Sequence, residues 1–172
     1  GTGNIAIGEA TLDGNQTGSY NTMGGYYAGY GSTNQSHTGN AAFGYFALTQ
    51  VTTGNYNTAI GNSAGYSIET GGSNVFLGYK AGYNETGSNK LYIENSDADS
   101  TGALIYGEFD TPLLRFNASV TMGSTEISVA SGDPVIVFDI GGTDKFTIGV
   151  DDSDSDKFKI SDGGALGTND RY

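Results

Sequence analysis

Short apolar segments recur along the first half of this chain, each one starting just after an asparagine and ending at a glycine. The clearest copy is residues 56–66, Tyr-Asn-Thr-Ala-Ile-Gly-Asn-Ser-Ala-Gly-Tyr. The glycines that end these segments are 17, 19, 17 and 17 residues apart: Gly8, Gly25, Gly44, Gly61 and Gly78. The asparagines keep the same steps: Asn4, Asn21, Asn40, Asn57 and Asn74. A nearly fixed period of this kind is typical of stacked repeat architectures.

Each repeat is long enough to form one rung of a parallel β-roll. The apolar pair before the glycine predicts a short strand, and a second short segment follows, centred on Ala28, Ala47, Ala64 and Ala81. We therefore expect two strands of about five residues and two turns in every rung, with rungs stacked about 4.8 Å apart. The predicted repeat head covers residues 1–94.

The glycine, asparagine and alanine that recur in the repeats each have a physical explanation. A glycine at the same place in every rung marks a corner where a Cβ does not fit. A recurring asparagine is able to stack its amide on that of the next rung. Alanine in the second segment makes the interior thin. Because a thin roll buries little apolar surface, we expect oligomerisation to supplement the core.

The second half of the chain reads as further short strands. Residues 89–94, 103–109 and 113–116 are expected to be strands in a transition region. Alternating apolar residues then predict more strands at Ile127/Val129, Val135/Val137, Phe146/Ile148/Val150 and Phe158/Ile160. We assign residues 95–172 to a β-rich stem or connector module. The fold class is all-β: a repeat-built, solenoid-like parallel β-roll followed by a short-stranded β stem.

Composition excludes several classes of protein. The chain has no cysteine, so disulfides and thiol chemistry are absent, and a net charge of −12 argues against nucleic acid as a partner. No apolar run approaches the ~20 residues of a membrane span, so membrane insertion is not expected. The chain begins at Gly1 within a repeat-like phrase, which indicates a fragment, a processed product or the ordered part of something longer.

The Asn-x-Ala-Ile-Gly repeats of residues 1–94 resemble the head repeats of trimeric autotransporter adhesins and of related phage and virus fibre proteins. The phrase from Leu91 to Phe116 resembles the segment that joins repeat heads to stems in phage tail-fibre-like proteins. The resemblance implies parallel β-rolls packed as a homotrimer, located outside the cell or on the virion surface. It implies as partners other copies of the chain, other fibre segments and a cell-surface receptor or glycan.

Two sets of residues are candidates for ligand chemistry. Asp152, Asp154 and Asp156 have the Asp-x-Asp-x-Asp spacing of a calcium loop, although Lys157 and Gly163 do not complete an EF-hand. The pattern favours a solvated hairpin tip over a bound Ca²⁺, and no other cofactor is predicted. His37 lacks cysteine or histidine partners for a metal site or a triad, so we expect it in a surface loop.

The other set is aromatic. Tyr26, Tyr45 and Tyr79 follow the anchoring glycines, whereas Tyr30, Tyr66 and Tyr83 close the second segments. Such a ladder packs on itself or on a neighbouring chain, or alternatively offers flat faces to a glycan or receptor. The pattern favours packing.

Sequence motifs of catalysis are missing. Nothing brings two of the scattered carboxylates together for glycoside hydrolysis, and no phosphate loop or nucleophile elbow is present. Together with the missing motifs, the resemblance implies a non-enzymatic fibre or adhesin segment, a rigid trimeric spacer that presents surfaces for attachment to a host or surface receptor. One alternative is a structural protein that polymerises into extracellular filaments or a surface layer. Another is part of a polysaccharide-degrading tailspike.

Overall fold

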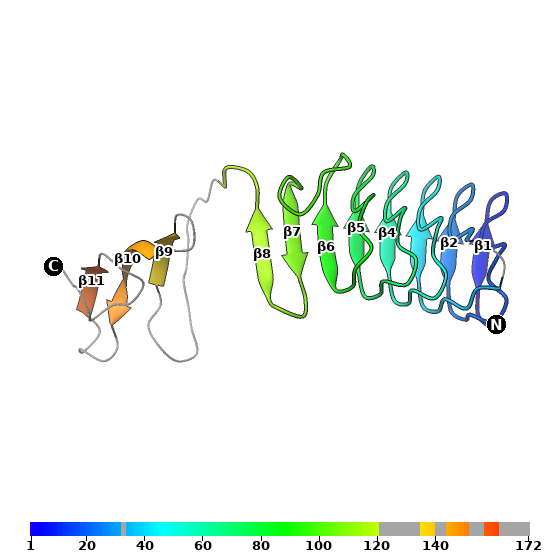
Figure 1. Cartoon of the computed structure of the whole chain (residues 1–172), viewed down its shortest axis with the longest axis horizontal. Helices are drawn as coiled ribbons and strands as arrows, with labels where there is room; N and C mark the ends of the chain where they lie inside the picture. Colours follow the sequence, from blue (N-terminus) through cyan, green and yellow to red (C-terminus); the bar gives the residue numbers. More distant parts are fainter. Residues whose placement is uncertain (32–33, 121–134, 140–143, 152–156, 162–172) are drawn as a thin grey trace. The chain divides into compact units, whose positions relative to one another are not determined.

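The structure is a computed structural model that describes residues 1–31, 34–120, 135–139, 144–151 and 157–161. The described residues are all-β and contain no helix. The chain divides into two compact units, residues 1–120 and 121–172. The first unit contains an eight-stranded sheet in the order β1 to β8, and the second contains a three-stranded sheet (Figure 1).

The repeats form a parallel β-solenoid, as the sequence predicts. Its five short strands each have three residues: β1 (Ile5–Ile7), β2 (Thr22–Gly24), β3 (Ala41–Phe43), β4 (Thr58–Ile60) and β5 (Val75–Leu77). All neighbours among them pair in parallel and in strict repeat register. We number the rungs from the asparagine before each strand, so that rungs 1 to 5 begin at Asn4, Asn21, Asn40, Asn57 and Asn74.

The corner glycines adopt the backbone conformation expected of them. Gly25, Gly44 and Gly61 have φ angles of 134°, 146° and 141°, a region that side chains with a Cβ rarely enter. A Cβ built on Gly61 would lie 2.2 Å from the carbonyl oxygen of Gly78 in the next rung. The rungs therefore stack too closely at this corner for any other residue.

The second segment of each rung differs from the prediction, because it is a series of turns and not a strand. Alternate residues have positive φ, as at Tyr27 (57°) and Gly29 (58°). Residues of a β-strand all have negative φ, so this segment is not a strand. Hydrogen bonds close turns within a rung, as from the N–H of Ala47 to the carbonyl of Gly44 (3.3 Å). Others join rungs, as from the N–H of Leu48 to the carbonyl of Ala64 (3.0 Å).

The asparagines form a continuous ladder, but mainly through the backbone. The side-chain oxygen of each asparagine accepts a hydrogen bond from the backbone N–H that begins the next strand region, at 2.7–3.1 Å. Its amide nitrogen donates to a carbonyl of the turn just before that point, as from Asn57 to Gly71 (2.9 Å). Direct amide-to-amide bonding occurs only between Asn21 and Asn4 (3.0 Å) within the described ladder. The ladder of Asn21, Asn40, Asn57 and Asn74 is almost completely buried.

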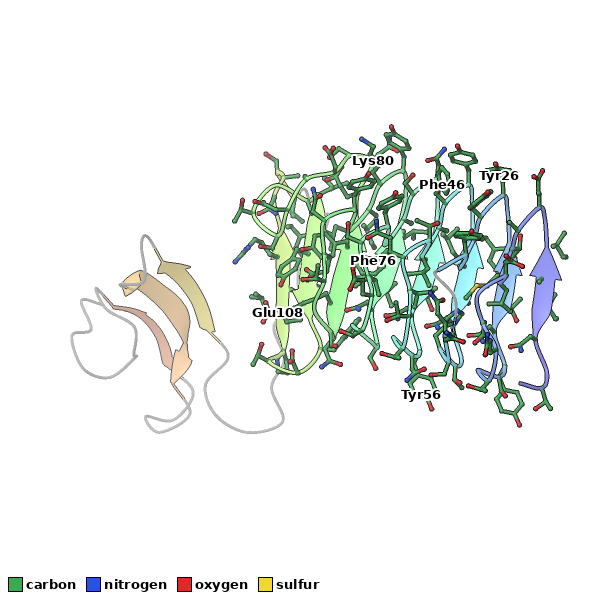
Figure 2. All side chains as sticks on the ribbon, turned by 45° about the vertical axis from the view of Figure 1, so that its right-hand side comes forward. Tyr26, Phe46, Tyr56, Phe76, Lys80 and Glu108 are labelled. Atoms are coloured by element: carbon green, nitrogen blue, oxygen red, sulfur yellow. The ribbon has the colours of Figure 1, made fainter. Side chains whose placement is uncertain are left out.

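The core is thin, as the small second segment predicts. Ala28, Ala47, Ala64 and Ala81 are fully buried on one wall. The central strand residues face them from the other wall, and the largest of these, Phe76, lies within the solenoid (Figure 2). Leu48, Val51 and Ile68 complete the centre of the core.

Three further strands continue the sheet: β6 (Lys90–Ile93), β7 (Ile105–Glu108) and β8 (Leu113–Phe116). They confirm the strands predicted in the transition region. β6 pairs in parallel with β5, whereas β7 and β8 pair antiparallel. The boundary expected after residue 94 falls where parallel pairing ends, with both sides in the same sheet and the same compact unit.

The second unit contains β9 (Val135–Asp139), β10 (Asp144–Asp151) and β11 (Lys157–Ser161). β10 pairs antiparallel with both neighbours, and the three strands confirm those predicted at Val135/Val137, Phe146/Ile148/Val150 and Phe158/Ile160. The register places Ile148 of β10 opposite Ile136 and Ile160. The strand predicted around Ile127 and Val129 lies outside the described residues.

Candidate functional site: an aromatic groove across three rungs

Aromatic side chains line one edge of the solenoid in three columns. The first column contains the residues directly after the anchoring glycines: Glu9, Tyr26, Tyr45, Asn62 and Tyr79. The second contains the next residue of each rung: Ala10, Tyr27, Phe46, Ser63 and Lys80. The third contains the residues five after the glycine: Asp13, Tyr30, Thr49, Tyr66 and Tyr83. Because each column repeats once per rung, its side chains lie about 4.8 Å apart along the solenoid.

The structure brings together two of the three tyrosines predicted to contact a glycan or receptor. The rings of Tyr26 and Tyr45 stack with centroids 5.5 Å apart and planes 9° apart, and both are exposed. Tyr79 is also exposed, but Asn62 occupies the rung between Tyr45 and Tyr79 and interrupts the column. Tyr79 contacts instead the ammonium of Lys80, 5.6 Å from its ring centroid.

The second column contributes two aromatic residues that the sequence analysis missed. Tyr27 and Phe46 meet edge to face at 5.5 Å, and each contacts its first-column neighbour. Both have positive φ within the turns of the second segment. Each comes directly before a buried alanine and is itself half-buried, and Figure 2 labels Phe46. Their equivalent positions in neighbouring repeats were the one signal available in the sequence.

The third column contains a gap in the middle of its aromatic run. Tyr66 and Tyr83 stack at 4.8 Å in adjacent rungs, and Tyr30 occupies the equivalent place in rung 2. Between Tyr30 and Tyr66, rung 3 carries Thr49, whose short side chain is buried. The gap leaves a hollow that spans two rung steps.

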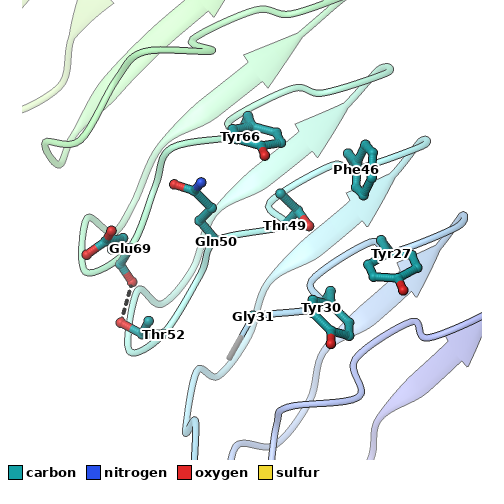
Figure 3. A pocket seen from close by; sticks show the side chains of 9 residues that line it. All are labelled: Tyr27, Tyr30, Gly31, Phe46, Thr49, Gln50, Thr52, Tyr66 and Glu69. Atoms are coloured by element: carbon teal, nitrogen blue, oxygen red, sulfur yellow. Dashed lines mark hydrogen bonds between the residues drawn. The ribbon is translucent and has the colours of Figure 1, made fainter. Parts of the chain in front are cut away.

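This hollow is a groove of about 740 Å³ (Figure 3). Tyr27, Tyr30 and Gly31 line it from rung 2, and Tyr66 and Glu69 line it from rung 4. Between them rung 3 supplies the rest of the lining: Phe46, Thr49, Gln50 and Thr52. The groove therefore has aromatic walls and a floor that contains hydroxyl and amide groups.

Hydrogen bonds hold the rungs together beneath the groove. The N–H of Gly31 donates to the carbonyl of Thr49 at 2.7 Å. The hydroxyl of Thr52 donates to the backbone carbonyl of Glu69 at 3.0 Å, while the Glu69 residue itself is exposed. Glu69 is the only charged residue that lines the groove in the described part of the chain.

His37 is not in a surface loop, contrary to our expectation. It is fully buried in rung 2, where Nδ1 lies 3.4 Å from the side-chain oxygen of Asn21 and 3.3 Å from the amide nitrogen of Asn40. Burial lowers the pKa of the imidazole to about 4. The lengthened repeat also buries Gln35, whose amide packs on Gly31. The lengthened repeat therefore places an imidazole and an amide inside the solenoid.

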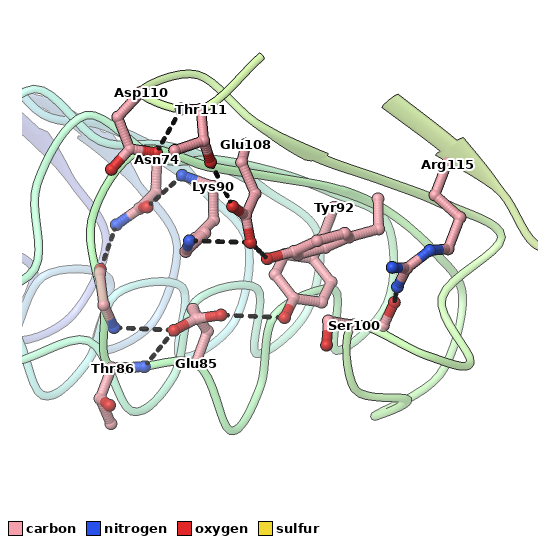
Figure 4. Close-up of polar contacts among 12 residues, drawn as sticks. Asn74, Glu85, Thr86, Lys90, Tyr92, Ser100, Glu108, Asp110, Thr111 and Arg115 are labelled. Carbon is pink, nitrogen blue, oxygen red and sulfur yellow. Dashed lines mark hydrogen bonds and ion pairs between the residues drawn. The ribbon is translucent and has the colours of Figure 1, made fainter. Parts of the chain in front are cut away.

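A separate polar cluster joins rung 5 to β6 and β7 (Figure 4). The Tyr92 hydroxyl donates to the Glu85 carboxylate (2.9 Å), which also accepts the N–H groups of Thr86 and Gly87. Glu108 accepts hydrogen bonds from Tyr106 (2.6 Å) and Thr111 (2.6 Å) and pairs with Lys90. Hydrogen bonds from Thr111, Tyr106 and Lys90 lower the pKa of Glu108 to about 2. These carboxylates have structural partners that close the end of the solenoid.

The predicted calcium ligands Asp152, Asp154 and Asp156 lie outside the described residues, so the cation site stays a prediction. β10 and β11 pair on either side of them. Among the described residues, no group of three or more histidine, aspartate or glutamate side chains is placed to hold a metal ion. The described part of the chain also has no helix long and apolar enough to span a membrane.

Comparison with known proteins found no family model, curated protein or solved structure that matches this chain.

Proposed function

We propose that this chain is a non-enzymatic fibre or adhesin segment, located outside the cell or on a virion surface. In this proposal the solenoid is a rigid spacer that associates as a homotrimer. Its aromatic edge is presented for attachment to a host or surface receptor. Repeated weak contacts on three chains bind strongly together because the second and third contacts are intramolecular.

The observation that carries the proposal is the outer face of the sheet. Two columns of outward side chains run along it in register, and neither contains a charged residue. One column is Ile5, Thr22, Ala41, Thr58, Val75 and Leu91. The other is Ile7, Gly24, Phe43, Ile60, Leu77 and Ile93. The antiparallel pairing extends the second column to Ile105 and Phe116.

Large apolar residues on this face are open to solvent. Ile7 is 68% exposed, and Phe43, Ile60 and Leu77 are each between 42% and 44% exposed. Soluble monomers rarely expose contiguous apolar patches of more than a few hundred Å². A face of this extent is therefore expected to be covered by a partner.

A second copy of the same chain fits this face better than an unrelated protein. Every copy presents the same columns at the same rung spacing, so ridges and hollows of the copies match along the whole solenoid. Two copies that meet through these uncharged columns avoid like-charge repulsion. Contacts through other parts of the surface would bring like charges together, because each chain has a net charge of −12. Three copies related by a three-fold axis close the contact into a discrete assembly.

Light scattering coupled to size-exclusion chromatography tests the proposal. We expect a mass of three times the 17.8 kDa chain, independent of protein concentration. Ile60→Lys places a charge in the apolar face and is expected to yield monomers. Thr70→Lys adds the same charge at an exposed turn outside the columns and is expected to remain trimeric.

Other outcomes of this measurement, and of a separate assay on host polysaccharide, would contradict the proposal. A wild-type monomer would rule out the homotrimer. Polymers of indefinite mass would favour the extracellular filament or surface layer instead. Release of reducing sugar from a host polysaccharide would favour the tailspike and contradict a non-enzymatic role.

A further inference from the structure

We propose that the groove across rungs 2 to 4 binds a neutral oligosaccharide, with one sugar ring held between Tyr30 and Tyr66. This inference rests on the proposed attachment function and assigns it a ligand class and a site. It goes beyond the tyrosine ladder expected from the sequence, which included Tyr30 and Tyr66, because the gap at Thr49 between these two residues creates the site.

The spacing of the two tyrosines suits an inserted ring. Tyr30 and Tyr66 occupy equivalent positions two rungs apart, a separation of roughly 9.6 Å. A guest ring midway between them would lie roughly 4.8 Å from each wall, within the range of about 4.5–7 Å typical of contacts between rings. The Tyr66–Tyr83 pair already shows such a contact, at 4.8 Å, between adjacent rungs of the same column.

The lining of the groove matches the two kinds of surface on a sugar. A pyranose has faces of C–H groups, which pack on aromatic rings, and a rim of hydroxyls, which require hydrogen-bonding partners. Tyr30, Tyr66 and Phe46 supply the apolar surface. Gln50 and Glu69 are exposed at the groove, where an amide or a carboxylate is able to bond neighbouring hydroxyls.

Charge distinguishes among possible ligands. Among the described residues, no lysine or arginine lines the groove, and the single charged side chain there is the carboxylate of Glu69. A sulfated, phosphorylated or uronic acid chain would meet a negative charge without a compensating cation. A basic peptide would pair with Glu69, but its flexible cationic side chains lack the flat C–H faces that a sugar ring packs on Tyr30 and Tyr66. The lining thus favours a neutral saccharide.

The experiment titrates the full chain with three neutral probes: maltohexaose, cellohexaose and N-acetylchitohexaose. Saturation-transfer NMR detects binding, and calorimetry measures the affinity. We expect at least one probe to bind weakly to each chain. Tyr66→Ala removes a wall and is expected to lower affinity about tenfold. Thr49→Tyr continues the tyrosine column of rungs 2, 4 and 5, and the new ring is expected to fill the gap and abolish binding, with circular dichroism checking that the variant folds.

Tyr56→Ala is the matched control, since Tyr56 is 67% exposed and lies outside both the groove and the three aromatic columns. Its affinity is expected to equal that of the wild-type chain. Loss of binding in Tyr56→Ala, with Tyr66→Ala unaffected, would overturn the groove as the site. Absence of binding to all three neutral probes would overturn the ligand class, as would preferential binding of hexagalacturonate or hexa-arginine.

The site is built within one chain, so it is separable from assembly. The monomeric Ile60→Lys variant is expected to bind each probe with the wild-type affinity per chain. If that variant binds while the wild-type chain is not a trimer, the trimer fails and the saccharide site stands. If the trimer forms and no probe binds, the saccharide site fails and the trimer stands.

Discussion

The side-chain oxygen of Asn40 accepts a hydrogen bond of 2.7 Å from the backbone N–H of Asn57. The same relationship recurs from Asn57 to Asn74, at 3.1 Å. Each asparagine thus satisfies a buried backbone donor of the next rung, and its amide satisfies a carbonyl of the turn that precedes it. The ladder links consecutive rungs through groups that water does not reach.

Replacing Asn57 with alanine is therefore expected to destabilise the fold strongly. The change leaves the N–H of Asn74 and the carbonyl of Gly71 without partners, and each unsatisfied buried group costs about 1–3 kcal/mol. We expect the free energy of unfolding to fall by at least about 2 kcal/mol. Urea unfolding followed by circular dichroism measures it. Asn95→Ala, at an exposed loop, is the control and is expected to have little effect.

Gly61→Ala is expected to disrupt the corner between rungs 4 and 5. The added methyl would lie 2.2 Å from the carbonyl oxygen of Gly78, on a backbone with a φ of 141°. The steric clash and the backbone strain together predict that the free energy of unfolding falls by about 3 kcal/mol or more. Gly102→Ala lies in an exposed loop without positive φ and should be tolerated. Equal thermal unfolding temperatures for the two variants would contradict the close stacking of the corners.

Phe76→Ala is expected to open a cavity at the centre of the solenoid. The Phe76 ring is fully buried and lies against Gly65 and Gly82, where a Cβ would approach it to 2.6 Å and 2.2 Å. Loss of a buried phenylalanine typically costs about 3–5 kcal/mol. Phe109→Ala provides the comparison, because Phe109 is 54% exposed. Chemical denaturation of both variants measures the free energy of unfolding. An equal decrease in Phe109→Ala and Phe76→Ala would argue against the burial of Phe76.

Buried His37 is expected to make stability depend on pH. Burial lowers the pKa of His37 to about 4 in the folded chain, whereas an unfolded histidine titrates near about 6.5. The unfolded chain therefore binds a proton first as pH falls. The contribution of neutral His37 to stability is complete above pH ~6.5. As pH falls toward ~4, the free energy of unfolding decreases by about 3 kcal/mol in total.

Urea midpoints measured between pH 7.5 and pH 4 check this expectation. His37→Gly is the control, since glycine occupies the equivalent place before the other ladder asparagines, as at Gly18 and Gly54. That variant is expected to lose most of the decline between pH 6.5 and pH 4.5. A decline of the same size in His37→Gly would assign the effect to other titrating groups.

The fold was largely predictable from the repeat. Gly61 and Asn57 recur at the same place in every rung, and only a few physical roles require one residue type at a fixed period. The strands of the transition region were predictable for a similar reason, because their apolar runs are short and bounded by polar loops. The candidate site was predictable only in part. Tyr30 and Tyr66 stood out in the sequence, whereas Tyr27 and Phe46 did not.

The sequence by itself determined the parallel stack, the corner glycines, the asparagine ladder and the thin alanine wall, since periodic identity specifies periodic contacts. Tertiary structure alone decided that the second segment is a series of turns, because positive φ at Tyr27 and Phe46 leaves no mark on the apolar pattern. It also decided that His37 lies inside, since the direction of an inserted loop depends on the rungs around it. The groove at Thr49 belongs to this second group. A gap in a column exists only after the rungs on either side of it have stacked.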